Sequence, residues 1–326
     1  MDAQHPYSAL TPDVVIDAVE AVGYRCDGRV LALNSYENRV YQVGRDDGPP
    51  IIAKFYRPGR WSTPSILEEH QFALELALAE VPVVAPEMHA GRTLLESAGF
   101  RYAIYPRCGG RWPELATPDE RCWMGRFLGR IHAIGATHAF QHRPTLDWRV
   151  LGADTAEYLL RDGWIPPHLE LAYESLARDV LRLVEQRFAD VMPLRRLRLH
   201  GDCHAGNVLW TDDGPHFVDL DDCMSGPAVQ DLWMLLSGER GEMSVQLGDL
   251  LEGYGDFADF DRRELSLIEP LRTLRVMHYA GWLARRWSDP AFPRAFPWFE
   301  EPRYWEQHVL NLREQLAAME EAPLNA

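Results

Sequence analysis

The feature that most constrains how this chain can fold is a polar loop between two short apolar runs. Apolar residues at 197–199 and 216–220 favour short strands, and the polar residues between them favour a loop. The loop begins His-Gly-Asp-Cys-His-Ala-Gly-Asn, so Asp202 precedes Asn207 by five positions. A second acid, Asp219, follows Asn207 by 12 positions, inside the second apolar run. The fold must therefore place a loop and a strand end where these three side chains can meet.

This spacing indicates phosphoryl transfer. In the catalytic loop of kinases an Asp accepts the proton of the attacking hydroxyl, and an Asn five residues later holds a magnesium ion. Asp219 stands where kinases place a second magnesium ligand. Mg²⁺ prefers hard oxygen ligands and combines few protein groups with phosphates and water. We therefore interpret Asp202 and Asp219 as catalytic residues, with Asn207 and Asp219 as ligands of Mg²⁺.

Lys54 is the single lysine among 33 basic residues. Codon usage that favours Arg explains the many arginines but does not explain why one lysine remains. Arg cannot replace Lys at a site that needs a compact ammonium group. Lys54 lies in the apolar stretch 51–55, which favours a strand. Kinases use such a lysine, paired with a helix glutamate, to bind the phosphates of ATP. The next helix offers Glu68 and Glu69, and we predict Glu69 as the partner.

The pattern along the chain changes from β-rich to helical near Gly109 and Gly110. Before that point it predicts a helix at 12–22, strands at 29–33, 39–43, 51–56, 92–96 and 100–106, and a helix at 62–80. Beyond it, it predicts helices at 121–138, 169–188, 229–236, 245–254, 261–287 and 305–320. Pro270 should kink or break the helix at 261–287. We predict an α+β fold with an N-terminal nucleotide-binding lobe at 1–107 and a larger, mainly helical catalytic and substrate lobe at 108–326.

These motifs resemble the aminoglycoside phosphotransferase and choline kinase family, and most closely the bacterial stress response kinase A family. Further segments that are similar to that family in order and spacing are 33–41, 68–72, 226–233 and 288–293. The resemblance implies a two-lobed protein-kinase-like fold, ATP as co-substrate, Mg²⁺, and transfer of the γ-phosphate to Ser or Thr hydroxyls of proteins in a stress response. It also implies that Asp202 is the base and that Ser35 contacts ATP.

The sequence departs from ordinary protein kinases around the same motifs. No Gly-x-Gly-x-x-Gly precedes Lys54, and no Asp-Phe-Gly is present. Only 12 positions separate Asp219 from Asp231, which leaves little room for a long activation loop. We predict that Asp231 braces the catalytic loop by accepting backbone hydrogen bonds and that His200 supports it. Asp221 is a further candidate metal ligand.

Other functions are weighed against this one. The same chemistry could serve a small alcohol such as a sugar, aminoglycoside, choline or homoserine, and Asp221 and Asp222 would suit a cationic acceptor. A metallohydrolase could use the alternating His200, Asp202 and His204, although this leaves Lys54 unexplained. A nucleotide-binding regulator without activity is the remaining alternative, and the retained catalytic side chains argue against it.

The composition of the chain limits which partners it can bind and in which cellular compartment it is expected. The net charge of −16 argues against nucleic acid as a partner. No run of about 18 apolar residues predicts a membrane span, and residues 1–10 lack the basic and apolar regions of a signal peptide. The odd number of cysteines, five, without a Cys-x-x-Cys motif favours a reducing cytoplasm over a disulfide framework. No motif demands an oligomer, so we expect a monomer that binds ATP and a protein substrate.

Overall fold

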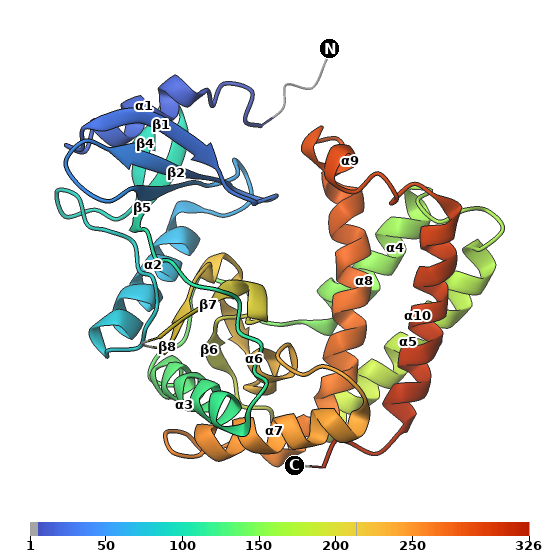
Figure 1. Cartoon of the computed structure of the whole chain (residues 1–326). Coiled ribbons are helices and arrows are strands. Elements are labelled where there is room, and N and C mark those ends of the chain that lie inside the picture. Colours follow the sequence, from blue (N-terminus) through green and yellow to red (C-terminus); the bar gives the residue numbers. More distant parts are fainter. Residues whose placement is uncertain (1–5, 213, 326) are drawn as a thin grey trace.

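The N-terminal lobe is built on a five-stranded antiparallel sheet with the order β1-β2-β3-β5-β4 (Figure 1). The computed structural model describes residues 6–212 and 214–325. The strands of this sheet are β1 Cys26–Ala32, β2 Arg39–Arg45, β3 Ile51–Phe55, β4 Leu95–Ser97 and β5 Phe100–Pro106. The helices of this lobe are α1 Pro12–Glu20 and α2 Thr63–Leu78. Each predicted strand and helix of this lobe is present, although β4 is shorter than expected.

Strand β3 positions the lysine because side chains alternate between the two faces of a strand. Ala53 and Phe55 are buried in the core that the sheet forms with Val15 and Val19 of α1. Lys54, between them, lies on the opposite face and meets side chains of α2 and of the second lobe. The apolar core of the small lobe therefore holds the backbone of Lys54 and directs its ammonium toward the other lobe.

The polar loop lies between two pairs of short strands. Its flanking strand β6 Leu197–Leu199 pairs with β9 Met224–Gly226, and β7 Val208–Thr211 pairs with β8 Gly214–Phe217. The loop connects β6 to β7, and Asp219 follows β8. The predicted strand at 216–220 ends at Phe217, because the chain turns sharply at Asp219 instead of continuing. This turn brings Asp219 out of the strand and into the interface between the lobes.

Helices make up most of the C-terminal lobe and surround two separate apolar cores (Figure 1). One group packs against the short strands: α3 Pro118–Gly135, α6 Val229–Trp233 and α7 Arg240–Tyr254. The other group forms its own layer, at the right of Figure 1: α4 Asp154–Arg161, α5 Glu170–Asp190, α8 Ile268–Arg286, α9 Ala291–Ala295 and α10 Pro302–Glu320. The prediction of a small β-rich lobe and a larger helical lobe is confirmed. The boundary after residue 107 stays a prediction.

The helix expected at 261–287 is broken close to Pro270, as predicted, although the break lies just before the proline. Helix α8 begins at Ile268, so Pro270 is its third residue, and a separate 3₁₀ helix occupies Arg262–Leu267. In the first turn of a helix the backbone N–H groups have no intrahelical acceptor, so proline loses nothing there. Pro270 therefore lies at the start of a helix rather than in the middle of one.

Membrane-spanning helices and disulfide bonds can both be checked in the described residues. Among them, no helix is both long enough and apolar enough to cross a membrane. All five cysteines lie in the described part of the chain and none forms a disulfide. Residues 1–5 of the segment in which a signal peptide was sought lie outside the described residues.

Helices α3 and α7 approach so closely that only glycine fits at their contact. A Cβ atom at Gly253 would lie 1.8 Å from the carbonyl oxygen of Cys122, and one at Gly125 would lie 2.0 Å from that of Leu250. Both obstacles are backbone atoms, which cannot rotate away as a flexible side chain can. A larger residue would therefore force the two helices apart.

We predict that Gly253→Ala lowers the free energy of unfolding by about 2 kcal/mol, because overpacking at a rigid contact strains the core. The control is Gly248→Ala in the same helix, where an added Cβ meets nothing within 4 Å. There alanine should stabilise the helix by up to about 1 kcal/mol, through its better helix propensity. Urea unfolding of both variants measures the difference, and equal shifts would contradict the close contact.

Candidate active site

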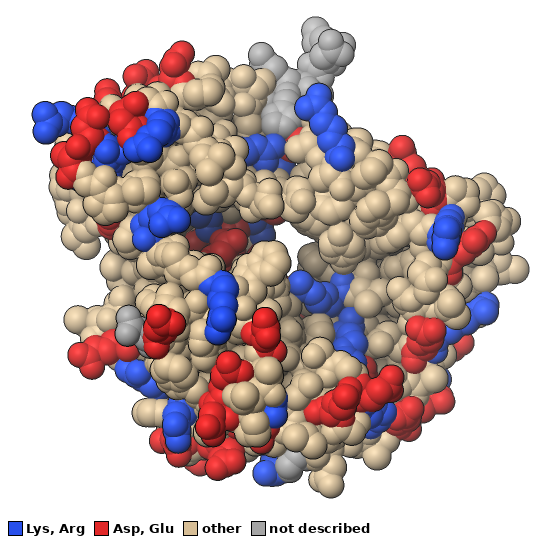
Figure 2. All heavy atoms as spheres, viewed as in Figure 1, with Lys and Arg blue, Asp and Glu red and all other residues tan. Residues whose placement is uncertain are grey.

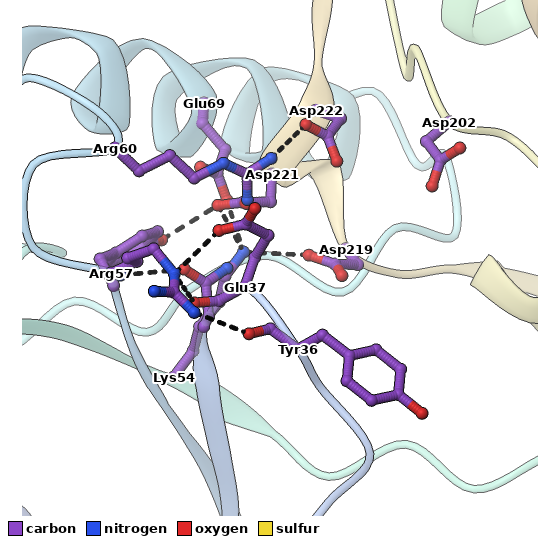
Figure 3. A network of polar contacts seen from close by, with 12 residues as sticks. Tyr36, Glu37, Lys54, Arg57, Arg60, Glu69, Asp202, Asp219, Asp221 and Asp222 are labelled. Atoms are coloured by element: carbon purple, nitrogen blue, oxygen red, sulfur yellow. Dashed lines mark hydrogen bonds and ion pairs between the residues drawn. The ribbon is translucent and has the colours of Figure 1, made fainter. Parts of the chain in front are cut away.

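Lys54 is buried between the lobes and is held by three carboxylates (Figure 3). Its Nζ lies 3.2 Å from Glu69 Oε1, 3.0 Å from Asp219 Oδ1 and 3.3 Å from Asp221 Oδ1. Burial lowers the pKa of Lys54, but the three carboxylates outweigh it and hold the pKa well above its ordinary value. The ammonium therefore stays charged at neutral pH although only 5% of the residue is exposed.

The two glutamates on α2 have different partners. Glu69 is buried and its carboxylate contacts Lys54, so the predicted pairing of these two side chains is present. Glu68 faces the other lobe, where its carboxylate accepts hydrogen bonds of 2.6 to 2.8 Å from the backbone N–H groups of residues 141–143. Successive helix positions differ by about 100° around the axis, so only one of two neighbours can face β3. A role of Glu69 in nucleotide binding stays a prediction.

Asp219 has an unusual backbone conformation. Its φ and ψ angles are 59° and 66°, in the left-handed region that residues other than Gly rarely adopt. Such a conformation costs free energy and is concentrated at functional positions. Here it directs the carboxylate of Asp219 toward Lys54, while 52% of the side chain remains exposed. Asp219 is therefore held near Lys54 and is still accessible to a ligand.

Arg60 is a cation at this site that sequence reasoning missed. Its guanidinium pairs with the carboxylates of Asp221 and Asp222 (Figure 3). Arg143 donates to the backbone oxygen of Asp221. Asp221 is thus buried among cations and does not line the cavity described below, which makes it a structural partner of Lys54 rather than an accessible metal ligand. No sequence signal marks Arg60, because it is one arginine among many.

The loop that carries Asp202 and Asn207 is braced from behind by Asp231. This buried carboxylate accepts hydrogen bonds of 2.8 Å from the backbone N–H groups of His200 and Gly201. His132 of α3 contacts the same carboxylate at 3.0 Å and was not anticipated. The imidazole of His200 lies 2.9 Å from the carbonyl oxygen of Val218, which ties the loop to the segment that carries Asp219. The predicted bracing by Asp231 and the supporting role of His200 are confirmed.

Asp202 is oriented by Asn207 and by an arginine from the helical layer. The amide of Asn207 donates to the backbone oxygen of Asp202 at 3.0 Å and lies 3.4 Å from its Oδ2. Arg275 of α8 donates to Oδ1 at 2.6 Å. Burial raises the pKa of Asp202, but contact with His204 and the charge of Arg275 outweigh it, so the pKa lies well below its ordinary value. Asp202 is therefore ionised at neutral pH.

A cavity of about 280 Å³ lies between the lobes, and most of the predicted site residues line it. Its lining contains Ser35, Lys54, Glu69, Asn207 and Asp219. Apolar side chains from both lobes complete the walls: Leu33, Val40 and Ile52 from the first, and Leu209, Val218 and Leu220 from the second. Asp202 is the one predicted site residue that does not line this cavity. Figure 3 shows it set apart from the cluster around Lys54.

The donor atoms in this cavity fit a hard divalent cation. Asn207 uses its amide N–H₂ on Asp202, which leaves its amide oxygen for another partner, and the carboxylate of Asp219 is half exposed. An amide oxygen and a carboxylate are ligands that Mg²⁺ accepts when phosphates and water supply the rest. The described residues contain no group of three or more His, Cys, Asp or Glu arranged for a metal.

The histidines of the loop do not form a metal site with Asp202. His200 contacts the carbonyl oxygen of Val218, and His204 accepts a hydrogen bond from the N–H of Gly206 through its Nδ1. These contacts are those of side chains that support a loop. The metallohydrolase alternative therefore loses the ligand set on which it depended.

The turn that carries Ser35 is fastened to the helical layer. Glu37 accepts hydrogen bonds from Trp282 at 2.5 Å and from Arg286 at 2.8 Å, both on α8. Arg57, which follows β3, donates to Asp289 at 2.6 Å, and both side chains are buried. The small lobe therefore meets the C-terminal lobe at this cluster as well as at Lys54 and Glu68.

Comparison with known proteins identifies the family. Residues 29–268 match the phosphotransferase enzyme family. Stress response kinase A of Escherichia coli is 45% identical over 98% of this chain and 96% of its own length. The serine/threonine protein kinase RdoA of Salmonella typhimurium is 44% identical over 99% of this chain and 98% of its own length.

Solved structures agree on the fold. The amicoumacin kinase hAmiN, in complex with AMP-PNP, Ca²⁺ and Ami, has a TM-score of 0.72 and is 20% identical, with 97% of this chain and 96% of that one covered. A microcompartment-associated aminopropanol kinase has a TM-score of 0.69 at 18% identity, covering 94% and 98%. From the family match and the near full-length similarity, this chain belongs to the phosphotransferase enzyme family and, within it, to the kinases of the stress response kinase A family.

Proposed function

We propose that this kinase transfers the γ-phosphate of ATP to Ser and Thr hydroxyls of proteins, as a cytoplasmic monomer that acts in a bacterial stress response. The observation that carries the proposal is the convergence of Lys54, Asn207 and Asp219 on one cavity, with Asp202 hydrogen-bonded to Asn207. The names of the relatives support a stress response and a protein acceptor.

The cavity offers separate surfaces to the base and to the phosphates of ATP. Apolar side chains such as Val40, Ile52 and Leu209 would hold the base. Lys54 would bind the α- and β-phosphates, with Glu69 fixing its position, and the turn at Ser35 would contact phosphate oxygens. Asn207 and Asp219 would hold Mg²⁺, which neutralises charge on the β- and γ-phosphates when bound.

Asp202 would act on the acceptor hydroxyl. It takes the proton as the hydroxyl oxygen forms a bond to the γ-phosphorus. The bond from that phosphorus to the bridging oxygen breaks, and its electron pair leaves with ADP. Asn207 orients Asp202 for this step, because its amide is fixed on the backbone and carboxylate of that residue.

We predict that Asp202→Ala reduces phosphate transfer from labelled ATP by about a thousandfold or more, because the proton acceptor is lost. ATP binding should persist, since Asp202 does not line the cavity. Asp179→Ala, an exposed acid on α5, is the control and should retain full transfer. Full activity of Asp202→Ala would overturn the assignment of the base.

We predict that Lys54→Arg lowers transfer by about a hundredfold, although it changes no formal charge. The guanidinium is broader than the ammonium and would have to fit among three carboxylates within a buried gap. Arg178→Lys, at an exposed position of α5, tests the reverse exchange and should have no effect. Wild-type transfer by Lys54→Arg would show that the position needs only a positive charge.

The class of acceptor is tested directly. The enzyme is incubated with labelled ATP and Mg²⁺, first with protein substrates and then with a panel of small alcohols. We expect acid-stable phosphate on Ser or Thr residues, identified by mass spectrometry. Phosphate incorporated only into small alcohols would exclude the protein acceptor while leaving the phosphotransferase assignment in place.

A further inference from the structure

A second cavity, of about 530 Å³, lies on the other side of the catalytic loop, against α8 and α10. Its polar lining includes His204 of the loop, Arg272, Arg275 and Tyr279 of α8, and Gln307 and Asn311 of α10. None of the described residues that line it is Asp or Glu. Figure 2 shows basic side chains inside the hollow beside the helical layer, whereas acidic and basic side chains are interspersed on the outer surface. The described lining of this cavity therefore offers two arginines and no carboxylate, in a protein of net charge −16.

The two arginines of this cavity differ in how firmly they are held. Arg272 pairs with Glu269 at 3.2 Å and lies over the ring of Trp233. Arg275 donates one hydrogen bond, to Asp202, and its guanidinium makes no other hydrogen bond to the described residues. Its side chain is 47% exposed. Arg275 is thus the arginine with donors left for a ligand.

The contact with Arg275 occupies one of the two carboxylate oxygens of Asp202. Oδ1 of Asp202 accepts from Arg275 at 2.6 Å, and Oδ2 lies 3.4 Å from both His204 Nε2 and Asn207 Nδ2. A hydroxyl that approaches Oδ1 from this cavity competes with the guanidinium for that oxygen. An anion on the substrate would relieve this competition, because a guanidinium binds an anion in exchange for a carboxylate.

We propose that the acceptor Ser or Thr lies next to an acidic side chain of its protein, and that Arg275 leaves Asp202 to pair with that carboxylate when the substrate binds. The inference rests on the proposed function, because it specifies the protein acceptor. It assigns Arg275 as a positioning residue that selects substrates and uncovers Asp202. It also disfavours a cationic acceptor, since Asp221 and Asp222 are paired with Arg60 instead of facing this cavity.

The test uses three peptides that contain one Ser and differ only in the flanking residues, which are Glu, Gln or Lys. For the wild-type enzyme, kcat/KM should be about tenfold or more higher for the Glu peptide than for the Gln peptide, and lowest for the Lys peptide. In Arg275→Gln the ratio of Glu to Gln peptide should fall close to one, mainly through KM. Arg178→Gln, on the exposed face of α5, is the matched control and should keep the wild-type ratio.

The split between KM and kcat separates this role from a purely structural one. In Arg275→Gln the KM for the Glu peptide should rise toward that for the Gln peptide, whereas a distorted loop would lower kcat for all three peptides. Because the side chain is half exposed, the variant should fold, which its nucleotide affinity would verify.

Each contrary result has a distinct meaning. A wild-type enzyme that phosphorylates all three peptides equally, or the Lys peptide best, would overturn the inference and leave the proposed function standing. A wild-type ratio in Arg275→Gln would overturn the role of Arg275. Transfer to small alcohols with none to any peptide would overturn the proposed function and this inference with it.

Discussion

The burial of one ammonium group is the constraint on which the arrangement of the lobes depends. A buried charge is costly unless it is paired, and Lys54 finds its three partners on two segments of the chain, one in each lobe. Glu69 belongs to the small lobe, whereas Asp219 and Asp221 follow β8 in the large lobe. The lobes must therefore meet around Lys54, and the cavity between them takes its shape from that meeting.

Helix α8 connects the two ends of the site. Near its middle Arg275 reaches Asp202, and near its end Trp282 and Arg286 hold Glu37 of the small lobe. The turn that carries Ser35 and the carboxylate of Asp202 are thus both held by side chains of one helix. A helix that is packed along most of its length keeps its shape, so the side chains that it carries stay at fixed distances from one another. This arrangement joins the nucleotide side and the acceptor side of the proposed site.

Local sequence patterns predicted most of the helices and strands. They failed where the conformation of a segment depends on its tertiary contacts. Strand β3 was predictable as a short apolar run between polar turns, and helix α2 from the Ser-Thr-Pro start at 62–64. The break near Pro270 was predicted, but the sequence spacing did not reveal that the residues before it, Arg262–Leu267, form a 3₁₀ helix. The helical segment at 149–161 was not predicted; it contains a π-helical turn at Arg149–Ala153 that does not follow the α-helical period.

The sequence by itself determined the candidate residues Asp202, Asn207, Asp219 and Lys54, because their chemistry and spacing are local properties of the chain. It also favoured Glu69 over Glu68 as the partner of Lys54, and the geometry of α2 agrees. Only the tertiary structure decided the placement of Arg60 and Arg275. Each pairs with a carboxylate more than 70 positions away, and in a chain so rich in arginine no local pattern distinguishes these two from the rest. Contacts between distant segments depend on how the lobes pack, and that is settled by the fold as a whole.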